Sequence, residues 1–113
     1  MTKEAEKTAQ MRLLNDELRA GKCLNGQIII TSGIAALEDD FKLQVTKAVS
    51  EFDAFTPEND PHQEHDFGSI EMQGHKVFFK IDYYDLDLKM HSPDACDPKV
   101  TTRILTIMLA EEY

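Results

Sequence analysis

The sequence feature that most constrains the fold is an alternating stretch on either side of a glycine turn. Residues 75–84 place apolar side chains at every second position, which is the pattern of a strand with one buried face. Residues 66–72 precede them, and the Gln73-Gly74 pair between the two runs provides a glycine for the positive φ of a two-residue turn. The pattern predicts an antiparallel hairpin in which Met72 lies opposite His75.

The rest of the chain has the periodicity of helices around one further strand. Apolar residues at helical spacing predict one helix in the first 21 residues and a second over residues 37–52. The β-branched run at 27–31 predicts a short buried strand. Asp97-Pro98 is typical of a helix start, and the apolar spacing of residues 100–113 predicts a third helix.

These elements follow the order α-β-α-β-β-α, which predicts an α+β fold. The expected architecture is a small three-stranded sheet that contains one antiparallel hairpin, with the helices packed on one of its faces. A chain of 113 residues is long enough for one hydrophobic core and too short for two. We therefore expect a single domain over residues 1–113, in which residues 1–6 fray.

Cysteine content and hydropathy indicate a cytoplasmic protein. Cys23 and Cys96 are its two cysteines, fewer than a short secreted scaffold normally carries. The first seven residues are rich in charge, and no apolar stretch of signal-peptide length follows them. The longest nearly apolar run, residues 104–110, is much shorter than the roughly 20 residues that span a bilayer. We expect no association with a membrane.

Acidic residues are concentrated in the second half of the sequence. Residues 1–49 hold seven basic and seven acidic side chains, whereas residues 50–113 hold five basic and fourteen acidic ones and carry the whole net charge of −9. Such a field repels phosphates, so direct nucleic-acid binding is not expected. The charge either keeps the protein soluble or attracts a protein partner with a basic surface. The acids expected to form that partner-binding surface are Glu51, Asp53, Glu58, Asp60, Glu64 and Asp87.

One end of the hairpin carries a candidate site for chemistry. Extending the hairpin register places His65 opposite Asp82 and brings His62 near Asp85. Imidazoles and carboxylates bind Zn²⁺ and other divalent metals, so these four residues are candidate ligands, with Asp66 as a further ligand or base. Without a metal, His65 and a nearby carboxylate, Asp66 or Asp82, form a candidate acid/base pair. The alternative is that both histidines hydrogen-bond the loop and the acids are simply solvated.

Three segments carry a resemblance to a known family. They are NDPHQEHDFG at residues 59–68, KIDYYD at residues 80–85 and TTRILTIMLAEEY at residues 101–113. On these segments the chain resembles a small bacterial domain family of unknown function whose members occur on plasmids and integrative mobile elements. The resemblance implies an accessory gene of mobile DNA, a setting that often holds inhibitors of restriction or CRISPR defence. It supplies no catalytic residues.

These observations lead to three hypotheses. The first is a small acidic accessory protein of bacterial mobile DNA that acts by protein–protein binding and inhibits a host defence system that targets nucleic acids. The alternative is a metal-dependent enzyme, such as a hydrolase, that uses the cluster of histidines and aspartates. The third is a homo-oligomeric module whose short sheet pairs edge to edge. Only the second hypothesis requires a cofactor, a divalent metal.

Overall fold

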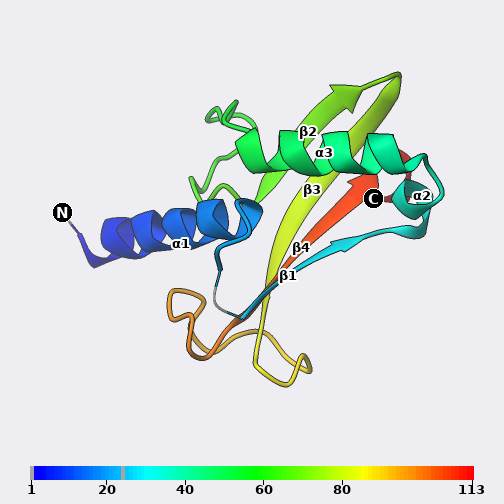
Figure 1. Cartoon of the computed structure of the whole chain (residues 1–113). Coiled ribbons are helices and arrows are strands. Elements are labelled where there is room, and N and C mark those ends of the chain that lie inside the picture. Colours follow the sequence, from blue (N-terminus) through cyan, green and yellow to red (C-terminus); the bar gives the residue numbers. More distant parts are fainter. Residues whose placement is uncertain (1, 24) are drawn as a thin grey trace.

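The computed structural model describes residues 2–23 and 25–113, which form an α+β fold around one mixed sheet (Figure 1). Its elements in chain order are α1 (Lys3–Arg19), β1 (Gly26–Ile30), α2 (Ser32–Ala35), α3 (Asp39–Glu51), β2 (Phe67–Met72), β3 (His75–Tyr84), β4 (Thr102–Leu109) and a short 3-10 helix, η1 (Ala110–Glu112). Among the described residues, no helix combines the length and the apolar character that crossing a membrane requires.

The sheet has four strands in the spatial order β1-β4-β3-β2, one strand more than the sequence predicted. β1 runs parallel to β4, and the β2–β3 and β3–β4 pairs are antiparallel. The predicted hairpin register is confirmed, because Met72 lies opposite His75. Gln73 and Gly74 both have a positive φ, as the favoured two-residue hairpin turn requires.

The prediction of a third helix is wrong, because residues 102–109 form β4 between β1 and β3. Four of these eight residues are β-branched, which favours a strand. β4 has a neighbour on each side and most of its residues are buried, so apolar and polar residues do not alternate cleanly along it. Periodicity alone does not distinguish such a run from a helix. Asp97 caps no helix, and its Oδ1 accepts a hydrogen bond from the Lys99 N–H at 2.9 Å in a turn.

The prediction that the strand at residues 27–31 is buried is also wrong. β1 lies at an edge of the sheet, and Ile28, Ile29 and Ile30 are 41%, 45% and 40% exposed. The buried core takes residues from β3 and β4 but none from β1. A run of isoleucines indicates a strand, but it does not indicate whether other elements cover that strand.

The two longer helices are confirmed by the structure. α1 buries Met11, Leu14 and Leu18, and the chain leaves the helix at Gly21, which has a φ of 79°. α3 carries acidic residues in its first turn, where the partial positive charge of a helix N-terminus favours them. α2 is a short additional helix between β1 and α3.

The helices cover one face of the sheet (Figure 1), and the hydrophobic core lies between these two layers. Burying each large apolar side chain there contributes roughly 1.5–3 kcal/mol to stability. On the other face of the sheet, the rings of Phe67, Phe78 and Tyr113 contact one another with centroids 5.1 to 5.8 Å apart. The buried core residues are Leu18, Ile34, Phe41, Val45, Val49, Val77, Phe79, Ile81, Leu105 and Ile107.

Glu112 ties η1 to the start of α2. Its Oε1 accepts hydrogen bonds from Thr31 Oγ1 at 2.6 Å and from the Leu109 N–H at 2.9 Å. Its Oε2 accepts a hydrogen bond from the Gly33 N–H at 3.0 Å. Hydrogen bonds from Thr31 and then from the Leu109 backbone favour the ionised form and lower the pKa of Glu112. The carboxylate therefore stabilises the packing of η1 against α2 while it is charged.

We expect Glu112→Gln to lower the Tm at neutral pH, and this difference from the wild type to disappear in acid. A carboxylate with a lowered folded-state pKa stabilises the fold above its ordinary pKa of 4.5. That stabilisation is lost as the pH falls through the folded-state pKa. Thermal melts across this pH range measure the effect, with the exposed neighbour Glu111→Gln as control. A Tm difference that does not change with pH would contradict a role for the charge.

Candidate functional site

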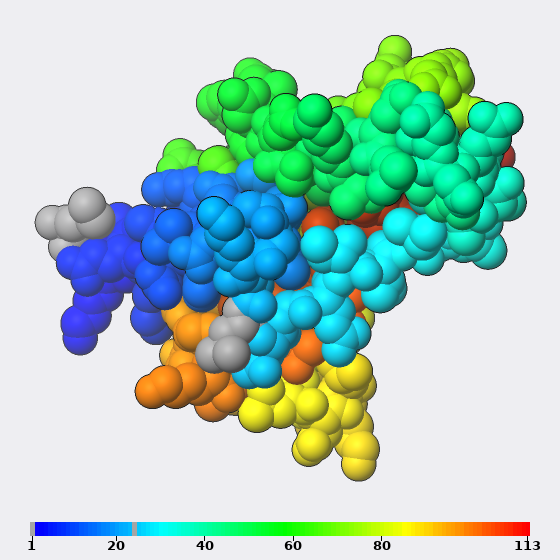
Figure 2. All heavy atoms as spheres, viewed as in Figure 1, coloured from blue at the N-terminus to red at the C-terminus, as the bar shows by residue number. Residues whose placement is uncertain are grey.

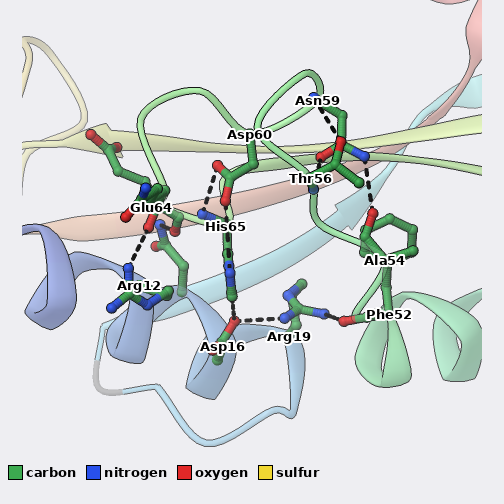
Figure 3. Close-up of polar contacts among 12 residues, drawn as sticks. Arg12, Asp16, Arg19, Phe52, Ala54, Thr56, Asn59, Asp60, Glu64 and His65 are labelled. Carbon is green, nitrogen blue, oxygen red and sulfur yellow. Dashed lines mark hydrogen bonds and ion pairs between the residues drawn. The ribbon is translucent and has the colours of Figure 1, made fainter.

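A polar network joins α1 to the loop before β2, as Figure 3 shows for Asp16 and His65, and also joins α1 to the sheet. We call it the α1 network. Four of its polar side chains are buried, and buried polar groups need hydrogen-bond partners, so the network constrains how the loop lies on the helix. Its members are Asn15, Asp16, Arg19, Asp60, Glu64, His65, Tyr83 and Arg103.

His65 is fixed by contacts to its ring and its backbone. Its Nδ1 lies 2.8 Å from Asp16 Oδ1, and its Nε2 lies 3.7 Å from Asp60 Oδ2. The ring stacks on Phe55, with the ring centroids 3.8 Å and the planes 4° apart. The backbone has a φ of 57°, a left-handed conformation that costs roughly 1–2 kcal/mol, and its N–H donates to Asp60 Oδ1 at 3.2 Å. The contacts with Asp16, Asp60 and Phe55 offset this cost.

Arg19 connects α1 to the end of α3. Its Nη2 lies 2.6 Å from Asp16 Oδ1, so Asp16 binds both this arginine and the His65 ring. Its Nη1 donates to the carbonyls of Val49 and Phe52, at 2.9 and 2.8 Å. Carbonyls at a helix C-terminus lack partners within the helix and carry partial negative charge, which a guanidinium satisfies.

Asn15 is fully buried and connects α1 to both the loop and the sheet. Its Nδ2 donates to the Glu64 carbonyl at 2.9 Å and to the Tyr83 hydroxyl at 2.8 Å. Its Oδ1 accepts a hydrogen bond from Arg103 Nε at 3.0 Å. Burial raises the pKa of Tyr83, so its hydroxyl keeps its proton and donates to Glu64 Oε1 at 3.0 Å.

Arg103 is a buried cation on the central strand, with 1% of its surface exposed. Its Nη2 donates to the Ala95 carbonyl and to Met11 Sδ, and its guanidinium carbon lies 5.1 Å from the centre of the Tyr83 ring. Burial lowers its pKa. Within the part of the chain that the structure describes, Nη1 has no hydrogen-bond partner. Because an uncompensated buried charge is costly, the hydrogen bond to Asn15 is important for stability.

Two surface cavities lie beside the α1 network. Arg12 borders both of them and donates to the Gln63 carbonyl at 3.0 Å. His65 and Asp60 border one of the two cavities, but both ring nitrogens of His65 face carboxylates. An imidazole bound by an aspartate at Nδ1 is the arrangement of an acid/base pair, but here Asp60 faces the second nitrogen. The cavity beside His65 has a volume of about 390 Å³, and the cavity beside His62 has about 430 Å³.

The prediction that His65 lies opposite Asp82 is wrong. Regular pairing of the hairpin begins at Phe67, and the positive φ of His65 turns the chain toward α1. Successive residues of a strand point to opposite faces, so Asp82 lies on the face away from Tyr83 and the network. There its Oδ2 is 3.0 Å from Lys80 Nζ.

The structure separates the other predicted metal ligands as well. His62 is exposed in the loop and lines the cavity beside α1. Asp85 lies in the turn after β3, where its Oδ1 accepts a hydrogen bond from the Lys89 N–H at 3.0 Å. Across residues 2–23 and 25–113, no group of three or more His, Cys, Asp or Glu side chains has a metal-binding arrangement.

Asp66, the further candidate ligand or base, is half-buried at the start of the hairpin. Its carbonyl accepts a hydrogen bond from the Ile81 N–H at 2.9 Å, which continues the predicted register by one residue. Burial, and then the negative charge of Glu64, raise the pKa of its carboxyl. The ionised carboxylate is therefore less favourable here than in water.

Of the six acids predicted to form the partner-binding surface, two belong to the α1 network and four are exposed to solvent. Asp60 is 5% exposed and Glu64 is half-buried, and both bind network residues. The exposed acids of the predicted set are Glu51, Asp53, Glu58 and Asp87, of which the first three lie at the end of α3 or in the loop after it.

The sequence analysis missed the network residues of α1 and β4. Asn15 and Arg19 lie on the same helical stripe as Met11, and polar residues on an apolar stripe indicate buried partners. Arg103 was assigned to a helix. Strand alternation instead places it on the same face as Leu105, toward α1.

Comparison with known proteins identifies a family whose function is unknown. A family model described as a protein of unknown function matches residues 30–112. No curated protein and no solved structure matches the chain. α1 precedes the matched residues, so the α1 network joins matched and unmatched parts of the chain.

We expect Asn15→Ala to lower the free energy of unfolding by about 3 kcal/mol, because it leaves the buried Arg103 Nε without a partner. Tyr83→Phe removes one hydroxyl and should cost about 1 kcal/mol, since Asn15 keeps its bond to the Glu64 carbonyl. Urea denaturation measures both values. Equal losses in the two variants would contradict the central role of Asn15.

We expect Asp66→Asn to raise the Tm at neutral pH. An acid whose folded-state pKa lies above its ordinary value loses stability as the pH rises through that folded-state pKa. The increase in Tm of Asp66→Asn over the wild type should therefore reach its full size above the folded-state pKa of Asp66 and should be absent below the ordinary pKa of 3.8. Melts across this range measure it, with the exposed Asp53→Asn as control. A less stable Asp66→Asn protein at neutral pH would refute the explanation.

Proposed function

The chain belongs to the DUF3768 family, whose function is unknown, and we propose that it is a small acidic protein-binding module for a partner with a basic surface. In its more specific form, the proposal is that the partner is a nucleic-acid-binding component of a bacterial defence system. The protein inhibits that component by occupying its basic groove. Carboxylates on a folded surface attract such a groove much as phosphates do. The reason for proposing a defence component as the partner is the sequence resemblance, which implies a gene of mobile DNA.

The observation that supports the proposal is the acidic loop between α3 and β2. Residues 48–75 contain seven acidic residues and no lysine or arginine. The exposed carboxylates of Glu51, Asp53 and Glu58 lie at the start of this segment. A positively charged partner therefore meets no like charge from the residues of this segment.

The loop is ordered by its own hydrogen bonds and by the α1 network. Asn59 Oδ1 accepts a hydrogen bond from the Thr56 N–H at 2.8 Å, and Asn59 Nδ2 donates to the Ala54 carbonyl at 3.0 Å (Figure 3). The contacts of Asp60 and His65 hold the following residues against α1. A loop that is already ordered loses less conformational entropy on binding, which favours affinity.

The network residues serve this binding function as supports. Both ring nitrogens of His65 face carboxylates, and Asp16 also binds Arg19. Asp82 and Asp85 lie elsewhere and have their own partners. The geometry therefore favours a binding module over the metal-dependent hydrolase.

We expect the triple variant Glu51→Gln/Asp53→Asn/Glu58→Gln to bind a poly-lysine peptide about tenfold more weakly than the wild type. This estimate takes roughly 0.5 kcal/mol for each exposed charge. Wild-type affinity should fall steeply as salt is added, because salt screens exposed charges. Titration calorimetry at two salt concentrations measures both effects.

The matched control is Glu4→Gln/Glu6→Gln/Glu111→Gln, which removes three exposed acids outside residues 48–75 and gives the same net charge. Equal weakening in the two triple variants would show that net charge alone is responsible. The specific form is tested in cells whose restriction or CRISPR system destroys an incoming plasmid. There the wild type and the control should protect the plasmid and the loop variant should not. A wild type that gives no protection refutes that form.

A further inference from the structure

β1 forms an unprotected edge of the sheet. Within the described residues no strand pairs with its outer side, and its three isoleucines are 40–45% exposed. Figure 2 shows atoms of this part of the chain, in cyan, at the surface. Natural edge strands are usually protected by charged side chains, proline or a bulge. The sequence of β1, GQIII, contains neither charge nor proline, and its pairing with β4 is regular.

The backbone groups on the outer side of β1 are available for a further strand. The Thr31 N–H and the Asn25 carbonyl both bond to β4. Alternate residues of a strand bond to the same neighbour, so the N–H and C=O groups of Gly26, Ile28 and Ile30 point away from β4. They meet no partner among residues 2–23 and 25–113.

The charge distribution identifies a second copy of this chain as the occupant of that edge. No charged residue lies between Lys22 and Glu38, although 29% of the chain is charged and its net charge is −9. Two such acidic molecules can approach along β1 itself, which carries no charge; the Glu112 carboxylate binds Thr31 Oγ1 just beyond the end of the strand. The other edge strand, β2, contains Glu71 and follows the acidic loop.

We propose that the protein forms a symmetric dimer through antiparallel pairing of β1 with β1 of a second copy. A twofold axis at Ile28 places this residue opposite Ile28 of the second copy, and Gly26 opposite Ile30 of the second copy. Each of these facing pairs exchanges two backbone hydrogen bonds. The interface is self-complementary, as a twofold dimer requires, and it joins two four-stranded sheets into one continuous sheet.

Side chains fit this register. Ile28 and Ile30 lie on the helix-facing side of the sheet, where they are 41% and 40% exposed at the border of the core. Gly26 stands opposite Ile30, and Leu18 Cδ1 and Cys23 Cβ lie 2.7 and 2.9 Å from the place of a Cβ there, so Ile30 of the second copy meets these two side chains. One five-residue strand from each copy buries less surface than the roughly 1,200 Å² that a stable complex buries. We therefore expect a weak dimer that forms as the protein concentration rises. This surface lies at the edge of the sheet opposite β2 and is independent of the proposed binding loop.

Disulfide trapping tests the register. In a Cys23→Ser/Cys96→Ser background, Ile28→Cys places two thiols across the twofold axis with Cα atoms about 5.5 Å apart, within the range of a disulfide. Ile30→Cys is the matched control, because it is equally exposed and on the same face. Its two copies are about 14 Å apart along the strands, beyond that range. With oxidised glutathione as oxidant, we expect Ile28→Cys to cross-link at least tenfold faster on a non-reducing gel.

Sedimentation velocity over a concentration series provides the second test. The mass of the wild type should rise from 12.9 kDa toward twice that value. Ile29→Lys should stay monomeric, because it places a lysine on β1 of each copy, and a lysine on an edge strand opposes pairing with a further strand. Leu43→Lys, at a 72% exposed position on α3, should associate like the wild type. Circular dichroism confirms that each variant is folded.

Three outcomes would overturn the proposal. The first is a wild type that remains monomeric at the highest soluble concentration, which would leave the β1 edge to a strand of another protein. The second is equal cross-linking of Ile28→Cys and Ile30→Cys. The third is a folded Ile29→Lys protein that associates as the wild type does.

Discussion

The buried hydrogen bond between Asn15 and Arg103 determines where α1 lies on the sheet, and much of the polar organisation depends on it. α1 buries only three apolar side chains, Met11, Leu14 and Leu18. A helix with so narrow an apolar stripe has many nearly equivalent ways to rest on a sheet. The buried Arg103 guanidinium needs hydrogen-bond partners, and its bond to Asn15 is directional. This bond therefore excludes most other positions of α1 on the sheet.

The position of α1 in turn determines the shape of the loop before β2. Three consecutive loop residues, 63–65, are each bound by a different side chain of the helix, Arg12, Asn15 and Asp16. Gln63 and His65 both have a positive φ, which is unfavourable for residues other than glycine. The helix thus holds the loop in a conformation that its own sequence does not favour, and this makes the acidic segment a defined surface.

Local patterns predicted the elements in which several signals agree. The hairpin register follows from the alternation and the glycine turn together, and α3 from its apolar stripe and acidic first turn. β4 was mistaken for a helix because burial removes its alternation. The partners of the site were beyond local patterns, since Asp16 and His65 are 49 residues apart and Asn15 and Arg103 are 88 apart. The histidines and acids of the loop predict a candidate site there, but the side chains that hold the loop come from distant segments.

The strand order has a consequence for how the chain folds. β4 is the last strand in the sequence, yet it lies between β1 and β3 and is the neighbour of both. Until β4 has been synthesised, a nascent chain on the ribosome can form the β2–β3 hairpin, but β1 has no strand to join. The isoleucines of β1 then remain unpaired until β4 is made 77 residues later, as the pairing of Gly26 with Arg103 shows. Such long-range pairing slows folding, and the waiting strand is the segment at which newly made chains are most open to aggregation or to chaperones.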